Sequence, residues 1–410
     1  WQDLNLNQAW QKGSHVDLFG NDQKDLSSPE NDERFKLIQE VLAKFKEAST
    51  FGSLICMDSP EQDFIDLQNT LEGLVIEGDT LQKAAAKKLL PLVIQAKLLA
   101  KKYDAVIANP PYMGANTITN LKEFAKDYYP DSKSDLFAMF IERGFDFCKE
   151  SGASSMVTMQ GWMFLTSYQN MREKLLLNHS IWTMAHLGAR AFPEISGEVV
   201  QTVAFVGQKK HIGGVKPAFF RLVDKNHEEK QYLLKNNLNR FDTTIQEDFQ
   251  KIPCSPIAYW VGNSIRDNFE KMPALADIAN AKSGLTSGDK PRFVREWYEV
   301  NHTKINFVAK NNQINLNKWF PHNDGGTARK WYGNRNHIIN WEKNGFVIKQ
   351  QRNSTIRNPS YYFKAGVTWT DISSSFFCAR LVDEGFIFEN TGSMVFSNNL
   401  IRILLLLFQL

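Results

Sequence analysis

Residues 103–112 have the sequence Tyr103-Asp104-Ala105-Val106-Ile107-Ala108-Asn109-Pro110-Pro111-Tyr112. The first six residues form a mostly apolar run that predicts a buried parallel β-strand. Two successive prolines cannot continue a sheet, so the strand must end at Asn109. The residues that follow form a rigid loop at the carboxyl end of a strand, where open α/β sheets place their ligands.

The size and composition of the chain are those of a globular protein. Its 410 residues suffice for two domains, and 43% of them are hydrophobic and 23% charged. The four cysteines include no CxxC pair and the eight histidines no HExxH spacing, so we expect neither a disulfide framework nor a metal site in a cytoplasmic protein. The apolar run at 400–410 is shorter than the roughly 20 residues of a bilayer span, so no membrane association is expected. Both ends of the chain look like cuts in a longer protein.

Hydrophobic periodicity predicts an α/β fold around the loop at residues 109–112, here called the prolyl loop. Upstream, helices are expected over 31–48 and most of 60–101, with a turn or short strand over 51–55. The elements expected downstream are a loop at 113–131, a helix at 134–150 with Ser134 or Asp135 at its N-cap, a strand at 154–160, a helix at 167–178, and strands at 181–187 and 199–206. Parallel strands joined by helices predict a doubly wound, Rossmann-like sheet. No helix separates the last two strands, which predicts an antiparallel hairpin at the sheet edge.

Beyond residue 215 the pattern changes to short mixed elements punctuated by glycines. We therefore predict one domain at 1–215 and a second, mixed α+β domain at 216–410. The net charge changes sign as well. Residues 1–200 carry 20 basic and 27 acidic residues, whereas residues 201–410 carry 28 basic and 18 acidic residues. Within 290–364 the counts are 14 and 4, and Trp and Tyr residues are interleaved with the basic ones. This mixture suits a phosphate backbone and exposed bases, although a solvated basic face around an aromatic core would have the same composition.

The residue types of the prolyl loop suit a substrate with an exocyclic or amide NH2 group. The lone pair of such a nitrogen is delocalised, and hydrogen bonds from both N–H groups to fixed acceptors localise it toward an electrophile. The Asn109 side chain and the Pro110 carbonyl are two such acceptors, and Pro111 keeps the loop rigid. Tyr112 presents a flat ring on which a base can stack. The loop therefore predicts a site for group transfer to nitrogen.

Asn109 to Tyr112 matches the motif (N/D/S)PP(Y/F/W), and the chain resembles the amino-group DNA methyltransferases. Residues 134–137, Ser-Asp-Leu-Phe, are similar to the segment of that family that lines the adenine pocket of S-adenosylmethionine, which implies a cofactor role for Asp135 and Phe137. Residues 187–206 are similar to a later segment whose phenylalanine, here Phe192, packs with the motif tyrosine against a flipped base. The motif order is typical of N6-adenine enzymes. The resemblance implies a partial class I methyltransferase core followed by a DNA target-recognition region.

More closely, the sequence resembles the PglX-type adenine-specific methyltransferases of bacterial BREX phage-defence systems. The residues that carry this resemblance are 89–104, 109–114, 156–165, 331–334 and 341–342. One departure is that the family's cofactor loop, of the type Asp-Pro-Ala-Cys-Gly-Ser-Gly, occurs nowhere in this sequence. The residue that contacts the cofactor adenine from the preceding motif is either Ser53 or Asp79, and the sequence does not distinguish them.

The function implied is methyl transfer from S-adenosylmethionine to adenine N6 of double-stranded DNA, as a self-marking step in phage defence. The DNA-binding candidates lie in the basic window, residues 290–364, and are Arg329, Lys330, Arg335, Arg352 and Arg357. Other phage-defence proteins are possible partners. Two alternatives stay open. One is methylation of a protein glutamine amide, and the other is a DNA-binding chain without catalysis that depends on another segment or partner for the cofactor.

Overall fold

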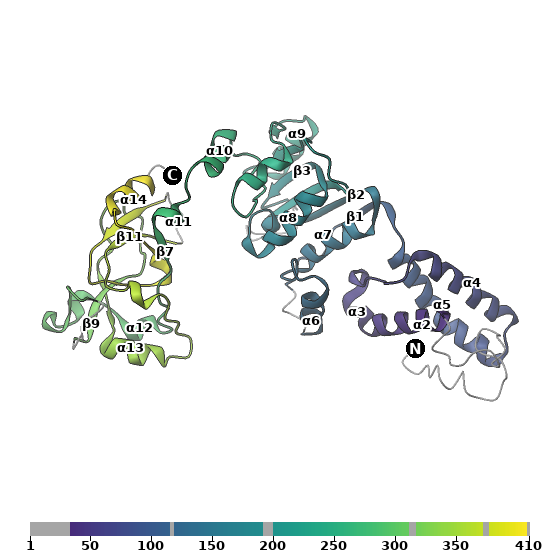
Figure 1. Cartoon of the computed structure of the whole chain (residues 1–410), viewed down its shortest axis with the longest axis horizontal. Helices are drawn as coiled ribbons and strands as arrows, with labels where there is room; N and C mark the ends of the chain where they lie inside the picture. Colours follow the sequence, from purple (N-terminus) through teal and green to yellow (C-terminus); the bar gives the residue numbers. More distant parts are fainter. Residues whose placement is uncertain (1–32, 115–118, 192–199, 311–316, 372–376, 408–410) are drawn as a thin grey trace. The chain divides into compact units, whose positions relative to one another are not determined.

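The computed structural model describes residues 33–114, 119–191, 200–310, 317–371 and 377–407. The chain divides into two compact units, Trp1–Lys271 and Met272–Leu410, each described by itself below (Figure 1). The sequence analysis placed the division after residue 215. The structure places it later because strands over 218–241 pair with the first sheet and complete it.

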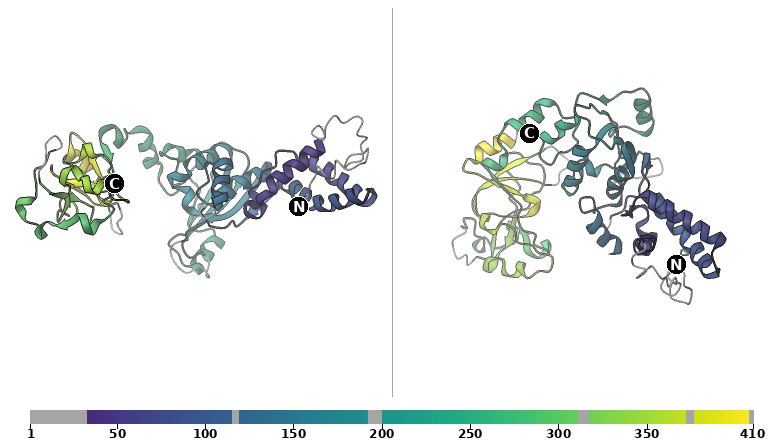
Figure 2. Two further views of the ribbon diagram at one scale, coloured as in Figure 1. Left: turned by 90° about the horizontal axis from the view of Figure 1, so that it is seen from below. Right: turned by 45° about the vertical axis from the view of Figure 1, so that its right-hand side comes forward.

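Helices and strands alternate through the middle of the first unit. The helices are α2 Glu33–Lys44, α3 Ala48–Phe51, α4 Glu61–Glu77, α5 Thr80–Ala100, α6 Thr119–Tyr128, α7 Leu136–Phe147, α8 Gln169–Asn178, α9 His227–Lys235 and α10 Asn263–Lys271, with 3-10 turns η2 Phe45–Glu47, η3 Gly52–Leu54, η5 Gln160–Met163, η6 Thr166–Tyr168 and η7 Gln246–Lys251. The strands are β1 Tyr103–Ala108, β2 Cys148–Met159, β3 Ser180–Gly188, β4 Thr202–Gln208, β5 Ala218–Arg221 and β6 Arg240–Phe241. Helices α2, α4 and α5 form a separate layer with their own apolar core (Figure 2).

The six strands form one sheet in the order β1-β2-β4-β3-β5-β6. Strand β1 is parallel to β2, as the sequence predicted. Strand β3 is parallel to β5, which the sequence analysis had placed beyond the first domain. Strand β4 is antiparallel to both β2 and β3 and lies between them, so the predicted hairpin is present but not at the edge. The central position of β4 follows from its apolar side chains, because Val203 and Phe205 are buried in the core on one face of the sheet.

Helices α7 and α8 pack on one face of this sheet (Figure 1). The prediction of a buried β1 is wrong, since β1 is an edge strand among the described residues and Ile107 is 83% exposed. The physical reason is that, among the described strands, β1 pairs with β2 alone, and that Ile107 points to the face opposite the one where Ala108 packs on the core with α7. The predicted α/β class of this part of the chain is confirmed, because the described strands form one mixed sheet on which α7 and α8 pack.

The segment 113–131, expected as a loop, contains helix α6. Its apolar residues Leu121 and Ala125 are buried together with Leu54 and Tyr129 in a small core. The Tyr129 hydroxyl donates a hydrogen bond of 2.7 Å to the Leu54 carbonyl. Helix α6 is therefore fixed against the turn η3 rather than extending as a free loop.

The second unit is mixed α and β, as predicted. Its strands are β7 Asn280–Lys282, β8 Val294–Glu296, β9 Trp319–Asn323, β10 His337–Asn340, β11 Gly366–Trp369, β12 Ala379–Val382, β13 Ile387–Phe388 and β14 Met394–Phe396. They form two four-stranded sheets, β13-β9-β10-β8 and β12-β11-β14-β7. The helices are α11 Leu275–Ile278, α12 Lys290–Phe293, α13 Glu342–Lys349 and α14 Leu400–Leu407, with 3-10 turns η8 Trp297–Glu299, η9 His302–Lys304, η10 Pro359–Tyr361 and η11 Asn390–Gly392.

The apolar C-terminal segment is a core helix. Residues Ile403, Leu404 and Leu407 of α14 are buried against β11, β12 and β14. Across the described residues, no helix combines the length and the apolar character that crossing a bilayer requires.

Arg143 joins three segments of the first unit. It lies on α7 and is only 3% exposed. Its guanidinium donates hydrogen bonds to the carbonyl oxygens of Ser53 (2.9 Å), Ile55 (2.7 Å) and Leu99 (3.1 Å). These bonds attach η3 and the end of α5 to the helix that covers the sheet, so one side chain connects the helical layer to the sheet layer.

We predict that Arg143→Met lowers the free energy of unfolding by about 2–4 kcal/mol, because one buried and two partly buried carbonyls lose a charged donor. Urea denaturation followed by circular dichroism measures the change. The control is Lys149→Met, which removes an exposed pair with Asp104 (2.9 Å) and should cost less than about 1 kcal/mol. Equal effects of the two substitutions would contradict the role assigned to Arg143.

Candidate active site at the end of strand β1

The prolyl loop begins where β1 ends, as the sequence predicted. Asn109 is exposed, Pro110 is buried and Pro111 is exposed. Tyr112 is half-buried and packs against the main core of the sheet. Asn109 therefore presents its side-chain acceptor to solvent while the adjacent proline anchors the backbone.

The Tyr112 side chain is held from two sides. Its hydroxyl lies 3.4 Å from Asn109 Oδ1 and 3.5 Å from the Val157 carbonyl oxygen, and its single proton can be donated to either. Its ring packs edge-to-face on Phe137, with centroids 6.3 Å apart and planes at 88°. Burial raises the pKa of Tyr112, so the hydroxyl stays protonated at neutral pH. The ring orientation is thus fixed relative to Asn109.

Asp135 fixes the far end of the loop. As the N-cap of α7, its Oδ1 accepts hydrogen bonds from the backbone N–H of Phe137 (3.3 Å) and of Met113 (3.1 Å). The Leu136 N–H donates to the Met113 carbonyl in return (3.0 Å). Burial raises the pKa of Asp135, against the opposing effect of these backbone donors. One carboxylate therefore caps a helix and positions the chain directly after Tyr112.

The two cofactor candidates of the N-terminal part lie at different distances from β1. Ser53 lines a cavity of about 550 Å³ together with Tyr103, Ala105 and Val106 of β1. Asp79 lies at the start of α5, where its carboxylate accepts from the Gln82 N–H (2.8 Å). The 21 residues of α5 span roughly 30 Å. Ser53 thus lies beside the strand that carries the site, whereas Asp79 is placed as a helix cap.

The remaining candidates of the first unit differ in what the structure describes. Phe137 is buried at 2% exposure beneath Tyr112 and contacts Tyr168 (5.8 Å between centroids). Its position supports the Tyr112 ring directly. Phe192, predicted to stack on the base, lies outside the described residues.

A buried polar group at the same edge of the sheet was missed by the sequence analysis. His186, near the end of β3, lies 2.6 Å from Gln160 Oε1 through Nε2 and 3.1 Å from the Tyr259 hydroxyl through Nδ1. Burial, with a contribution from Arg221, lowers the pKa of His186 to about 4, so the ring is neutral at pH 7. The signal was present, because His186 shares the alternating buried register of Met184.

The basic candidates of the second unit divide into two groups. Arg329, Lys330, Arg352 and Arg357 are exposed. Arg335 instead pairs with Asp383, donates to the Leu381 carbonyl (3.2 Å) and stacks on Tyr332 (4.0 Å). Arg335 is therefore used mainly within the fold.

Exposed aromatics accompany the exposed basic residues. Trp331 and Tyr332 are 50% and 65% exposed, directly after Lys330. The loop before them is held by buried Arg380, which donates to the carbonyls of Gly325 (3.1 Å) and Arg329 (3.4 Å). By contrast, Trp341 and Tyr362 are buried in the core. The basic window thus contains both an aromatic core and an exposed basic and aromatic loop.

Comparison with known proteins finds similarity to methyltransferases. The family model described as Eco57I restriction-modification methylase matches residues 25–192. A protein of Escherichia coli O9:H4 (strain HS), named adenine-specific methyltransferase BrxX, is 46% identical over 404 residues, or 97% of this chain and 33% of that protein. The predicted resemblance to adenine-specific methyltransferases is confirmed.

A second relative and one solved structure add to this. Adenine-specific methyltransferase PglX of Lacticaseibacillus casei (strain Zhang) is 38% identical over 386 residues, or 88% of this chain and 32% of that protein. The chain therefore spans about a third of the length of these curated relatives. The Type IIL restriction-modification enzyme MmeI in complex with DNA superposes with a TM-score of 0.45 at 11% identity, covering 87% of this chain and 60% of that one.

We predict that Asp135→Ala lowers the free energy of unfolding by about 1–2 kcal/mol and speeds hydrogen exchange of the Met113 amide, because that N–H loses its acceptor. Thermal denaturation and exchange mass spectrometry measure the two effects. Asp135→Asn keeps an acceptor oxygen in the same place and serves as the control, with little change expected. Unchanged exchange at Met113 in the alanine variant would show that the loop is held by other contacts.

Proposed function

We propose that this chain carries the target-base site of an N6-adenine DNA methyltransferase that uses S-adenosylmethionine. The observation that carries the proposal is the prolyl loop at the end of β1, where exposed Asn109 stands next to a tyrosine ring fixed by Phe137. The 46% identity to an adenine-specific methyltransferase supports it. In this proposal the two acceptors of the loop select an amino group as the methyl acceptor.

The loop acts on the adenine amino group by hydrogen bonding. Asn109 Oδ1 accepts one N–H and the Pro110 carbonyl accepts the other, which orients the nitrogen lone pair away from the loop. Pro110 itself has no N–H to compete. Tyr112 stacks on the base once it has been turned out of the duplex, and Phe192 is proposed for the opposite face. Because these groups are held before binding, little reorganisation is needed at the moment of transfer.

S-adenosylmethionine would supply the methyl group as an electrophilic sulfonium. The cavity beside Ser53 fits part of this cofactor, since its lining is mostly apolar and its volume of about 550 Å³ lies in the range of ligand sites. Ser53 is the proposed polar contact there. Asp135 and Phe137 do not line this cavity, and their proposed role is to hold Met113 and Tyr112 at the prolyl loop. Among the candidates named from sequence, Asp79 is not used in this proposal because of its place at the far end of α5.

We propose the exposed loop around Arg329, Lys330 and Trp331 as a DNA-binding surface, with Arg352 and Arg357 as further contacts. Basic side chains neutralise phosphates, and exposed aromatic rings stack on bases or sugars. The biological role proposed from the BrxX and PglX relatives is self-marking of cytoplasmic DNA in phage defence, together with other defence proteins.

We predict that Asn109→Ala in the intact gene product lowers DNA methylation by at least about 100-fold, because one of two preorganised acceptors is lost. Transfer of labelled methyl groups from S-adenosylmethionine to adenine in double-stranded DNA measures this. DNA affinity should change less than about threefold, since Asn109 contacts the flipped base alone. Methylation retained by Asn109→Ala would contradict the role assigned to Asn109.

Two control variants refine this test. Asn109→Asp keeps an oxygen acceptor and should retain more activity than the alanine variant, and Tyr112→Phe keeps the ring and should lose less than Tyr112→Ala. Calorimetric titration of S-adenosylmethionine into this chain tests the non-catalytic alternative, which predicts no binding by the chain alone. Methylation of a glutamine amide instead of adenine would favour the protein substrate.

We predict that replacing both Arg329 and Lys330 by Ala weakens DNA binding about tenfold or more at physiological salt. The slope of log K against log salt should become shallower by up to about 1.8, because each phosphate contact contributes about 0.9. The matched control is the double Ala substitution of Lys87 and Lys88, exposed on α5. An equal effect of the control pair would indicate a general charge effect rather than a binding surface.

A further inference from the structure

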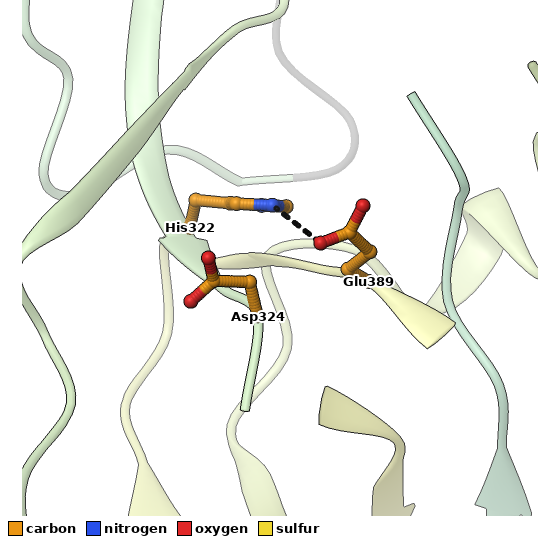
Figure 3. A group of neighbouring side chains, drawn as sticks. All are labelled: His322, Asp324 and Glu389. Carbon is orange, nitrogen blue, oxygen red and sulfur yellow. Dashed lines mark ion pairs between the residues drawn. The ribbon is translucent and has the colours of Figure 1, made fainter. Parts of the chain in front are cut away.

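Three buried ionisable side chains meet at the ends of β9 and β13 in the second unit. His322, Asp324 and Glu389 are 0%, 8% and 6% exposed, and one donor atom of each lies within 4.8 Å of the others (Figure 3). The register explains their meeting, because β13 runs parallel to β9 with Ile387 opposite His322. Asp324 and Glu389, which directly follow β9 and β13, are therefore brought close to His322. The sequence analysis expected no metal site, since Glu389 lies far along the chain from His322 and Asp324 and the three residues match no ligand spacing.

The orientation of His322 defines the chemistry of this group. Its Nδ1 lies 3.1 Å from the Ile387 carbonyl oxygen, which can only accept, so Nδ1 carries the proton. Its Nε2 is buried, has no hydrogen-bond partner, and points at Glu389 with a separation of 3.8 Å from Oε2 (Figure 3). In the neutral ring, the Nε2 lone pair faces a carboxylate at a distance too long for a hydrogen bond. A cation between them would satisfy both groups.

The charge around this point is negative. Asp324 and Glu389 are buried, and a third carboxylate, Glu296, lies 3.4 Å from the His337 ring that also contacts Asp324. Lys290 is the residue with a permanent positive charge that contacts this cluster. Its Nζ lies 2.6 Å from Asp324 and 3.6 Å from Glu389. The Lys290 side chain is 49% exposed, so its ammonium can move into water. It therefore marks a path by which an ion can enter from solvent.

We propose that His322 Nε2, Asp324 and Glu389 bind a divalent transition-metal ion such as Zn²⁺ or Mn²⁺, and that the Lys290 ammonium occupies the place of this ion when it is absent. One imidazole nitrogen and two carboxylates form a donor set that such ions accept. At metal–ligand distances of about 2.1 Å, tetrahedral donors lie roughly 3.4 Å apart, close to the spacing of Nε2 and Glu389. The bond from Nδ1 to a backbone carbonyl is the outer contact that fixes a metal-binding histidine in this tautomer.

The ion would join β9 to β13 and fix the start of the exposed basic loop. Asp324 leads directly into Gly325 and the segment that carries Arg329, Lys330 and Trp331. The Thr391 hydroxyl already ties the Asp324 carbonyl to the segment after Glu389 (3.0 Å). A metal at this position is structural in role and does not depend on the proposed methyl transfer.

The test uses the 410-residue chain after chelation and dialysis, titrated with MnCl2 or ZnCl2 by calorimetry and followed by thermal denaturation. We expect one equivalent of ion to bind and to raise the melting temperature. Mn²⁺ is included because it binds thiolates more weakly than Zn²⁺ does, so binding to the four cysteines does not obscure the result. The variant His322→Asn can keep a donor toward the Ile387 carbonyl but lacks Nε2, and should weaken Mn²⁺ binding at least tenfold.

Two further variants complete the design. Lys290→Met removes the competing ammonium, so it should lower the melting temperature without ion, tighten Mn²⁺ binding severalfold, and have its stability restored by the ion. His302→Asn applies the same substitution as the main variant to an exposed histidine of the same unit, and should leave Mn²⁺ binding unchanged. Equal Mn²⁺ affinity of the parent and His322→Asn, or no binding by the parent and by Lys290→Met, would overturn the inference.

Discussion

The hydrogen bonds accepted by the Asp135 carboxylate are the constraint on which the candidate site depends. They connect the first turn of α7 to the backbone that follows the prolyl loop. The two prolines stiffen the loop at one end, and Asp135 fixes it at the other. The Tyr112 ring then lies between Phe137, on the same helix, and the Asn109 side chain. A single capping residue thus serves helix stability and loop geometry together.

The same helix also connects the site to the rest of the first unit. Arg143, two turns after Asp135, bonds the carbonyls of η3 and the end of α5. This places Ser53 next to the body of β1, within reach of the cavity proposed for the cofactor. His186 near the end of β3 and Gln160 directly after β2 lie at the carboxyl ends of two strands that run in the same direction with β4 between them, which brings their polar groups to one edge of the sheet. The site is therefore built by several elements around one helix.

In the second unit, the basic window contains both buried and exposed aromatic residues. Trp341 and Tyr362 fill its core, whereas Trp331 and Tyr332 stay exposed beside Lys330. Buried Arg380 supplies the hydrogen bonds that hold this loop. The buried carboxylates at the ends of β9 and β13 lie at the base of the same loop, so charge is used inside the fold as well as on its surface.

The sequence by itself determined the features that depend on neighbouring residues. The Pro-Pro pair ended β1, the spacing of apolar residues predicted α7 and α8, and Asp135 was one of the two expected caps. Arg143 could have been found as well, because it occupies the apolar register of Leu136 and Met139 on α7. Only the tertiary structure decided the insertion of β4 between β2 and β3, the exposure of Ile107 at the sheet edge, and the meeting of His322 with Glu389. These features arise from contacts between residues far apart in the chain, and local periodicity carries no information about which distant strands pair.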